Sequence, residues 1–327
     1  MANDEISLED RVVIVTGSGG GLGRAYALAV AARGASVLVN DIGVTPDGLA
    51  ASHGPAKGVV AEIEAAGGKA IANFDSVATK KGAESIVAAA LEGFGRVDAV
   101  VNNAGVFLGG EVGSLEVENV EAMLNTHLLG SLWLTNAAFP HMREQQFGRF
   151  VFITSANAVF GSSGGGMYAV VKTGLVGLMH ATASAGAPHG ILSNAVAPVG
   201  KTRLAMELPE DFDMSQLPPE VRRMYQATKN YGDSERPEFV APLVAYLCSP
   251  ACAINQEVFS AVAGRYARIF TGVTPGWFGP RNTPPLPEDV RDHLDEIEDH
   301  TGYKVPRSVT DELEIVAAQV AQHLREK

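Results

Sequence analysis

A serine, a tyrosine and a lysine in the middle of the chain have types and spacing suited to acid/base chemistry. Tyr168 and Lys172 are four positions apart, so on a helix both side chains project from one face and their heads can meet. A free phenol titrates near about 10, and a neighbouring ammonium favours the phenolate, so we expect Lys172 to lower the pKa of Tyr168 toward the range of a working base. Ser155 lies thirteen positions before Tyr168, at the end of the apolar run 150–154. A parallel strand there would bring it to the ligand-binding edge of a doubly wound sheet.

A strand, a glycine-rich turn and a helix are expected near the start of the chain. Residues 12–16 form a short apolar run, typical of a strand buried on both faces, and residues 25–33 are strongly helix-forming. The loop between them contains Gly17, Gly21, Leu22 and Gly23. Bare backbone N–H groups and the helix dipole at such a turn face a pyrophosphate, so the sequence predicts a dinucleotide site here.

An acidic residue ends the second expected strand. Asp41 follows residues 35–40 and lies eighteen positions after Gly23. Its carboxylate can accept hydrogen bonds from both ribose hydroxyls and would repel a 2′-phosphate, so we expect NAD rather than NADP as the cofactor. The alternative role for Asp41 is that of an ordinary residue capping a turn.

Polar groups also follow the third and fourth expected strands. Asp75 and Ser76 come directly after residues 70–74 and are placed to meet an adenine, with an ordinary strand-end turn as the alternative. The fourth strand leads into an amide-rich turn that could hold backbone groups beside the cofactor, and this turn contains Asn102, Asn103, Ala104 and Gly105. Asp98 is expected to pack structurally rather than to act in catalysis.

Composition excludes several classes of protein. The net charge of −12 argues against a nucleic-acid or anionic-membrane surface, because both need clustered cations. No run of about 18 apolar residues predicts a membrane span, and the acidic start does not resemble a signal peptide, so a cytoplasmic location is expected. Two cysteines are too few for a disulfide framework or a full thiolate site, and no metal is expected.

The alternation of strands and helices predicts an α/β fold with one Rossmann-type, doubly wound parallel sheet covered by helices on both faces. We expect a single NAD-binding domain over residues 8–269. Within it, the irregular and apolar-rich segment of about 200–236 is expected to be a substrate lid, with packing on a partner subunit as the alternative. Residues 270–327 are expected to form a helical extension that packs on the core or on a partner subunit, with helices near 287–299 and 310–324.

The glycine loop, the Asn102–Gly105 turn, Ser155 and the Tyr168–Lys172 pair together resemble the short-chain dehydrogenase/reductase family. Any one of these motifs is weak evidence, but their order and spacing are specific. Segments 21–28, 39–43, 72–77 and 237–244 resemble the (3R)-hydroxyacyl-CoA dehydrogenase subgroup more closely. The likeness spans roughly residues 10–265, and the tail resembles the subgroup loosely.

The resemblance implies roles for the central residues. Tyr168 would be the general base, Ser155 would donate to the substrate oxygen, and Lys172 would bind the ribose and lower the pKa of the tyrosine. His127 stands where the family commonly has asparagine. A water relay to Lys172 and a purely structural role both remain open for His127, and Asn125 is a competing candidate.

The resemblance also implies a reaction and a substrate class. Pro198 and Val199 stand where Pro-Gly is common after the sixth strand, which leaves the nicotinamide contact to backbone and weakens any role for Thr202. The expected activity is NAD-dependent oxidation of a secondary alcohol, with a (3R)-3-hydroxyacyl-CoA thioester as the first substrate candidate. A hydroxysteroid or terpenoid alcohol is the alternative, and a silent NAD-binding sensor or scaffold is a remote one. Helices of 117–146, where Pro140 suggests a kink or break, and 165–187 would form a homodimer or homotetramer.

Overall fold

The structure is a computed structural model that describes residues 5–43, 52–108, 110–162, 165–200, 212–217, 219–280 and 283–323. The chain divides into two units, residues 1–268 and residues 269–327. Each unit is described by itself below.

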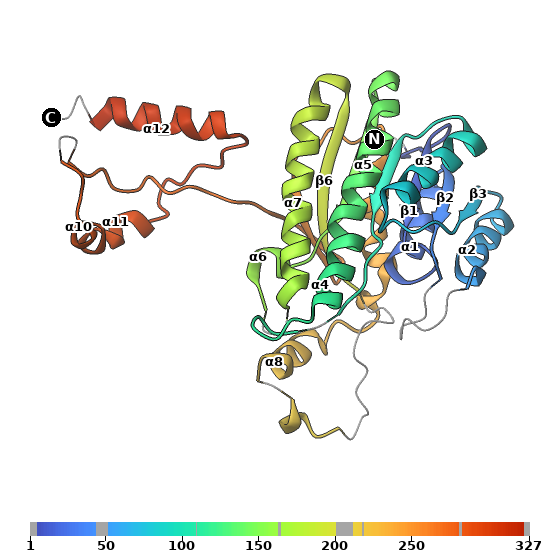
Figure 1. The fold of residues 1–327 in the computed structure, drawn as a ribbon, viewed down its shortest axis with the longest axis horizontal. Helices are drawn as coiled ribbons and strands as arrows, with labels where there is room; N and C mark the ends of the chain where they lie inside the picture. The colour runs from blue at the N-terminus through green and yellow to red at the C-terminus, as the bar shows by residue number, and fades with distance from the viewer. Residues whose placement is uncertain are drawn as a thin grey trace. The chain divides into compact units, whose positions relative to one another are not determined.

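Within the described residues, eight strands form one sheet in the order β3-β2-β1-β4-β5-β6-β7-β8. Among them, Figure 1 labels β1, β2, β3 and β6. The strands are β1 (Val12–Thr16), β2 (Ser36–Asn40), β3 (Lys69–Asn73), β4 (Ala99–Asn102), β5 (Gly148–Ile153), β6 (Ile191–Val199), β7 (Val258–Val262) and β8 (Arg265–Ile269). Neighbours from β3 to β7 pair in parallel. The order reverses between β1 and β4, which is where doubly wound sheets bind dinucleotides. The predicted Rossmann-type fold is confirmed.

Strand β8 was not predicted from the sequence. It follows β7 after the two residues Ala263 and Gly264, whose φ angles are 52° and 76°. Two consecutive positive φ angles are typical of a tight hairpin turn, and such a short connection requires antiparallel strands. The sheet is therefore mostly parallel, with one antiparallel edge strand.

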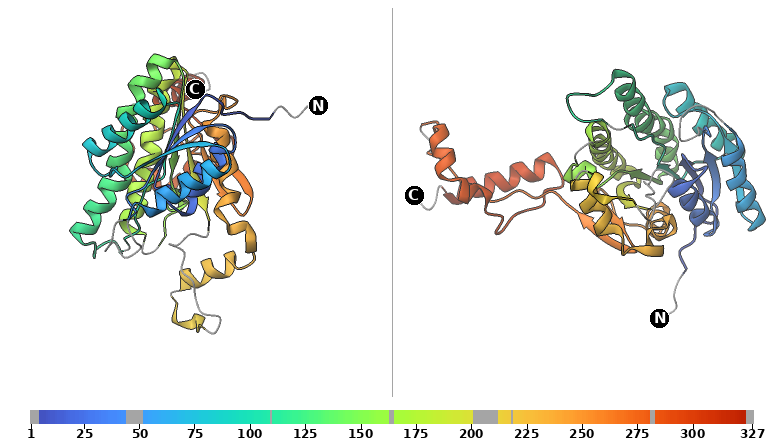
Figure 2. Two further views of the ribbon diagram at one scale, coloured as in Figure 1. Left: turned by 90° about the vertical axis from the view of Figure 1, so that its right-hand side faces the viewer. Right: turned by 90° about the horizontal axis from the view of Figure 1, so that it is seen from below.

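Helices lie on both faces of the sheet (Figure 2). Helix α1 (Gly21–Ala31) packs against α2 (Gly54–Ala65) and α9 (Ala241–Cys248). On the other face, α5 (Gly130–Gln145) packs against α3 (Lys80–Phe94) and α7 (Gly166–Gly186). The core lies between these layers, because strands such as β1, β4 and β5 are buried on both faces.

The segment 117–146 is helical, as expected, but it is interrupted at a different place from Pro140. It contains α4 (Val117–Met123), a π-helical turn (Leu124–Leu129) and then α5. Pro140 lies inside α5, so the chain has no break there, and the interruption lies at the π-helical turn. A π turn adds a residue to the helical repeat and changes which side chains face inward.

Shorter helical pieces complete the first unit. They are α6 (Asn157–Phe160), α8 (Pro219–Thr228) and 3-10 turns at Ala187–His189, Met214–Gln216, Gly232–Glu235 and Pro237–Phe239. Helix α8 gives the expected lid segment more regular structure than the sequence suggested. Residues 201–211, which include Thr202 and the apolar Leu204, Met206 and Leu208 of the expected lid, lie outside the described residues.

The second unit contains α10 (Pro287–Asp292), α11 (Leu294–Glu298) and α12 (Val309–His323). Trp277 stacks on His293 with ring centroids 4.1 Å apart, and Phe270 stacks on Tyr303 at 5.7 Å. None of its described residues whose exposure is known is buried. Among the described residues of the whole chain, no helix is long and apolar enough to span a membrane.

Candidate active site

Ser155, Tyr168 and Lys172 come together at the carboxyl end of β5. Ser155 follows β5, and Tyr168 and Lys172 lie near the start of α7. A hydrogen bond joins the hydroxyls of Ser155 and Tyr168. The Lys172 Nζ donates to the carbonyl of Ile153 at 2.7 Å and lies 5.5 Å from the centre of the Tyr168 ring. Thr154 ties the strand to the helix, because its Oγ1 donates to the carbonyl of Lys172 at 2.7 Å.

The expected lowering of the Tyr168 pKa by Lys172 is wrong for this geometry. Burial raises the pKa of Tyr168, and the hydrogen bond from Ser155 lowers it by less. Burial also lowers the pKa of Lys172 to about 7. Desolvation disfavours both charged forms, and burial rather than Lys172 sets the direction in which the pKa of Tyr168 moves.

The glycine loop after β1 is tied to the turn after β4. The Asn103 Nδ2 donates to the carbonyls of Thr16 (2.8 Å) and Gly17 (3.1 Å). The Thr16 Oγ1 accepts from the backbone N–H groups of Asn103 and Ala104, each at 3.1 Å. Gly17 has a φ of +63°, and a Cβ on it would lie 2.8 Å from the Ala104 Cα. A glycine is required there because the two loops approach so closely.

The other loop residues border the same space. Gly21 begins α1, and a Cβ on Gly23 would lie 2.6 Å from the Asn103 Nδ2. The Leu22 side chain lies close to Gly200, which follows β6. Pro198 and Val199 end β6, where they pair with Ala261 and Val262 of β7.

Asp41 contacts the glycine loop directly. Its Oδ2 accepts from the backbone N–H of Gly19 at 2.8 Å, and its Oδ1 accepts from that of Gly43 at 2.7 Å. These bonds hold the carboxylate at the carboxyl edge of β2. Each oxygen keeps a second lone pair that could accept from a ribose hydroxyl.

Asp75 and Ser76 take part in a polar network at the end of β3. The Asp75 Oδ2 accepts from the Asn73 Nδ2 (2.9 Å) and the Ser85 Oγ (2.8 Å). The Ser76 Oγ accepts from the N–H of Ala78 at 3.2 Å. These bonds give both residues a strand-end role, in line with the alternative considered from the sequence.

His127 lies in the π-helical turn and is 2% exposed. Its Nε2 is 2.7 Å from the carbonyl oxygen of Val106, and its ring is edge-on to Tyr168 at 5.7 Å. Burial, together with the nearby Lys172, lowers the pKa of His127 to about 3. The competing residue Asn125 accepts the N–H of Gly130 through its backbone carbonyl.

Phe107 is a residue of this site that sequence reasoning missed. Its ring is edge-on to Tyr168 at 5.1 Å, and the side chain is 50% exposed. Its position two residues after the Asn102–Gly105 turn was a signal that could have found it. Val159, Phe160 and Val170 are also exposed, on α6 and α7, which contact each other. The surface around this part of the fold therefore carries several exposed apolar side chains.

Asp98 lies at the amino end of β4, away from the carboxyl edge. It accepts hydrogen bonds from Arg11, Arg96 and the N–H of Val12. A structural role therefore fits Asp98. Cys248 and Cys252 are buried thiols, and no group of three metal-ligating side chains occurs among the described residues.

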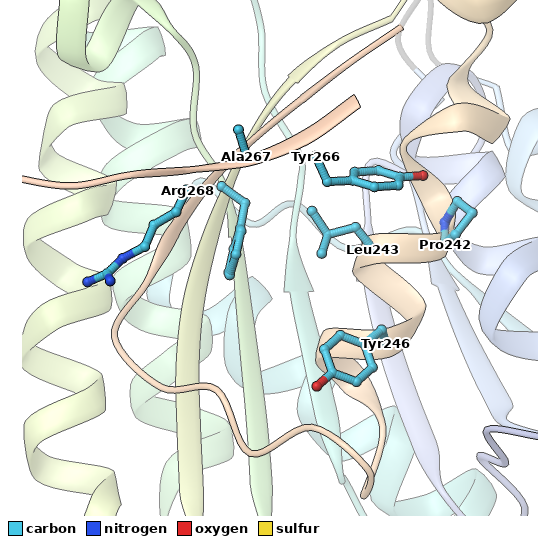
Figure 3. Close-up of a pocket in the computed structure, with 7 residues that line it drawn as sticks. Pro242, Leu243, Tyr246, Tyr266, Ala267 and Arg268 are labelled. Atoms are coloured by element: carbon cyan, nitrogen blue, oxygen red, sulfur yellow. The ribbon is translucent and has the colours of Figure 1, made fainter. Parts of the chain in front are cut away.

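A separate pocket of about 320 Å³ lies between α9 and the β7–β8 hairpin (Figure 3). It is lined by Pro242, Leu243, Tyr246, Phe259, Tyr266, Ala267 and Arg268. It contains none of the residues predicted for catalysis or cofactor binding.

Comparisons with known proteins identify the family of the chain. Residues 11–212 match the family model described as short chain dehydrogenase. A short-chain type dehydrogenase/reductase of Mycobacterium tuberculosis is 43% identical over 91% of this chain and 97% of that protein. Peroxisomal multifunctional enzyme type 2 of Mus musculus is 39% identical over 93% of this chain, which spans 39% of that enzyme.

Two solved structures of related proteins are similar to this chain in fold. A short chain dehydrogenase from Mycobacterium avium has a TM-score of 0.74 and 32% identity, covering 90% of this chain and 96% of that one. Full-length peroxisomal multifunctional enzyme type 2 from Drosophila melanogaster has a TM-score of 0.76 and 28% identity, covering 98% of this chain and 51% of that one. The chain belongs to the short-chain dehydrogenase/reductase family, as its motifs predicted.

Proposed function

We propose that this oxidoreductase, which acts on CH–OH groups, is an NAD-dependent dehydrogenase that interconverts (3R)-3-hydroxyacyl-CoA and 3-ketoacyl-CoA. The observation that carries the proposal is the hydrogen-bonded Ser155–Tyr168 pair beside the buried Lys172. The likeness to peroxisomal multifunctional enzyme type 2 over nearly the whole chain supports the substrate class. The chain spans 39% of the Mus musculus enzyme and 51% of the Drosophila melanogaster enzyme, so their activities come to it as proposals.

The proposed reaction divides the work among three side chains. NAD, when bound, supplies the acceptor for the hydride that leaves the alcohol carbon. Tyr168 takes the hydroxyl proton from the substrate. Ser155 donates a hydrogen bond to the substrate oxygen as that oxygen becomes a carbonyl. Lys172 holds the ribose and, when charged, favours the tyrosinate that accepts the proton.

The raised pKa of Tyr168 suits the phenol to the reverse reaction. A protonated Tyr168 can donate its proton to the oxygen of a ketone while a hydride adds to the carbon. Oxidation needs the deprotonated tyrosine, so its rate is expected to rise with pH. The environment therefore favours reduction at lower pH and oxidation at higher pH.

Several residues would hold the cofactor. The fit is supported by Gly17 and Gly23, where side chains would collide with neighbouring groups, and by the start of α1 beside them, which has no side-chain cap hydrogen bond. Asp41 supports NAD over NADP because a 2′-phosphate would meet its carboxylate. Asn103, Ala104 and Gly105 would line the nicotinamide side, with backbone at Pro198 and Val199.

The proposed lid segment contributes cations for the phosphates of CoA. Arg223 and Lys229 are exposed in and after α8. Arg222 instead donates to the carbonyls of Ser215 and Leu217 at 3.0 and 3.1 Å, so it holds the segment together. Lys201 and Arg203 lie outside the described residues.

The proposed organisation follows the two units. Residues 8–269 would form the dehydrogenase domain, including the lid of about 200–236. Residues 270–327 would pack on the core or on a partner subunit. The active form would be a homodimer or a homotetramer.

The test is NADH production from NAD by the purified protein. Matched (3R)- and (3S)-3-hydroxyacyl-CoA thioesters would be compared with hydroxysteroids and terpenoid alcohols. Turnover confined to the (3R) thioesters is expected. Turnover confined to free alcohols would overturn the substrate class, and turnover with NADP alone would overturn the cofactor.

A further inference from the structure

His127 occupies an unusual place in the helical segment before the catalytic tyrosine. It lies in the π-helical turn Leu124–Leu129, where the N–H of Gly130 donates to the carbonyl of Asn125 five residues earlier. Such turns are rare and frequently occur at functional sites. The side chain is buried against the loop that follows β4.

The ring of His127 makes its hydrogen bond through one specific nitrogen. The Nε2 lies 2.7 Å from the Val106 carbonyl oxygen, which can only accept, and 3.1 Å from the Val106 backbone nitrogen, whose N–H is directed at it and can only donate. A neutral imidazole nitrogen either donates or accepts. The shorter distance assigns the proton to Nε2, which donates to the carbonyl. The Nδ1 then carries the lone pair, and it is buried without a partner among the described residues.

The same loop connects His127 with Tyr168. Phe107 follows Val106, and its ring is edge-on to Tyr168 at 5.1 Å. The His127 ring contacts Tyr168 itself at 5.7 Å. A Cβ on Gly105 would lie 2.8 Å from the His127 Nδ1, so the ring fills the space that a side chain there would need. Loop 105–107 is thus shaped around the imidazole.

The electrostatic surroundings argue against proton transfer through His127. Burial and the charge of Lys172 lower the pKa of the imidazole to about 3. A protonated ring would place a second cation in a buried site that already contains Lys172. The neutral ring is therefore suited to holding the loop.

We propose that His127 is a positioning residue whose Nε2 hydrogen bond to Val106 holds loop 105–107, so that Phe107 packs against Tyr168 and forms a wall of the substrate site. This rests on the proposed function, because it takes Tyr168 as the acid/base residue. The positioning role depends on the Nε2 atom of His127, whereas a proton relay to Lys172 would use the Nδ1 atom.

Two amide substitutions separate these roles. The amide nitrogen of glutamine reaches the position of Nε2, whereas that of asparagine reaches the position of Nδ1. His127→Gln is expected to keep kcat within roughly 3-fold of the native protein, and His127→Asn to lower it by about 10- to 100-fold through misplacement of the reacting groups. The pH profile of kcat keeps its shape in both variants. The matched controls are His180→Gln and His180→Asn, at an exposed position on α7.

The opposite pattern would overturn the proposal. An active His127→Asn, an inactive His127→Gln and a shifted pH profile would show that His127 acts through Nδ1. Nitrogen-15 NMR of histidine-labelled protein gives a readout independent of activity. We expect a protonated Nε2 and a bare Nδ1 at His127 at neutral pH, and the reverse tautomer would refute the donation from Nε2 to the Val106 carbonyl on which the proposal rests. If the native protein turned over no substrate, the proposed function would fail while this measurement still tested the hydrogen bond.

Discussion

Replacing Asp41 by alanine should weaken discrimination between NAD and NADP. The carboxylate is held between the N–H groups of Gly19 and Gly43, at 2.8 and 2.7 Å. In the proposed site it faces the adenosine ribose, where NADP carries its additional phosphate. Asp41→Ala removes both the acceptor for the ribose hydroxyls and the charge that repels that phosphate.

The size of the effect follows from the charges involved. Two unit charges 4 Å apart repel by about 1 kcal/mol in water and about 4 kcal/mol at an effective dielectric constant of 20. Asp41 is half-buried, and a phosphate monoester carries about 1.5 to 2 charges. A repulsion of about 2–4 kcal/mol corresponds to a roughly 30- to 1,000-fold change in the ratio of specificity constants, since about 1.4 kcal/mol is tenfold.

The assay is the ratio of kcat/KM for NAD to kcat/KM for NADP with one alcohol substrate. The ratio should fall mainly because kcat/KM for NADP increases. In addition, kcat/KM for NAD should decrease because the ribose contact is lost. Glu64→Ala is the matched control, because Glu64 is an exposed carboxylate on α2 and the change in net charge is the same. A folded Asp41→Ala variant with an unchanged ratio would refute the ribose contact.

Three further variants test the remaining assignments. Tyr168→Phe should lower turnover by about 10²- to 10⁴-fold, the usual contribution of an acid/base group, while NADH binding measured by fluorescence stays near the native value; retained turnover would contradict the role. Lys172 has a pKa of about 7 in the folded protein and an ordinary pKa near 10.5 in the unfolded chain. Between pH 7 and pH 10.5 the unfolded chain therefore binds more protons than the folded protein, so the free energy of unfolding rises with pH. Lys172→Met should remove this increase in the free energy of unfolding, which urea unfolding between pH 7 and 10 would detect. An equal increase with pH in the native protein and in the variant would contradict the lowered pKa of Lys172. Asp98→Asn should destabilise the fold by about 3 kcal/mol, because Arg11 and Arg96 lose a buried partner; an altered kcat/KM in the folded variant would contradict its structural assignment.

Much of the fold could be predicted because parallel strands carry strong local signals. Continuous apolar runs such as 12–16 and 150–154 predicted strands buried on both faces, and β1 and β5 form there. Strand β8 has no such run, since two of its five residues are Arg265 and Arg268, and it forms as the partner of β7. Its signal was the tight Ala263–Gly264 turn.

The meeting of the candidate site residues was also predictable from the sequence. Gly17, Asp41, Asn103 and Ser155 each follow a strand, and parallel strands bring their carboxyl ends to one edge. The spacing of Tyr168 and Lys172 placed them on one face of a helix. These conclusions need only the order of the elements along the chain and the residue periodicities of strands and helices.

Tertiary structure alone decided the electrostatics and the partners within the site. The sequence places an ammonium near a phenol, but burial determines which way each pKa moves, and here it raises that of Tyr168 and lowers that of Lys172. The contact between His127 and Val106 depends on a π-helical turn and on a loop twenty-one residues earlier in the chain. Desolvation and long-range packing depend on all the atoms around a group, so local spacing cannot encode them.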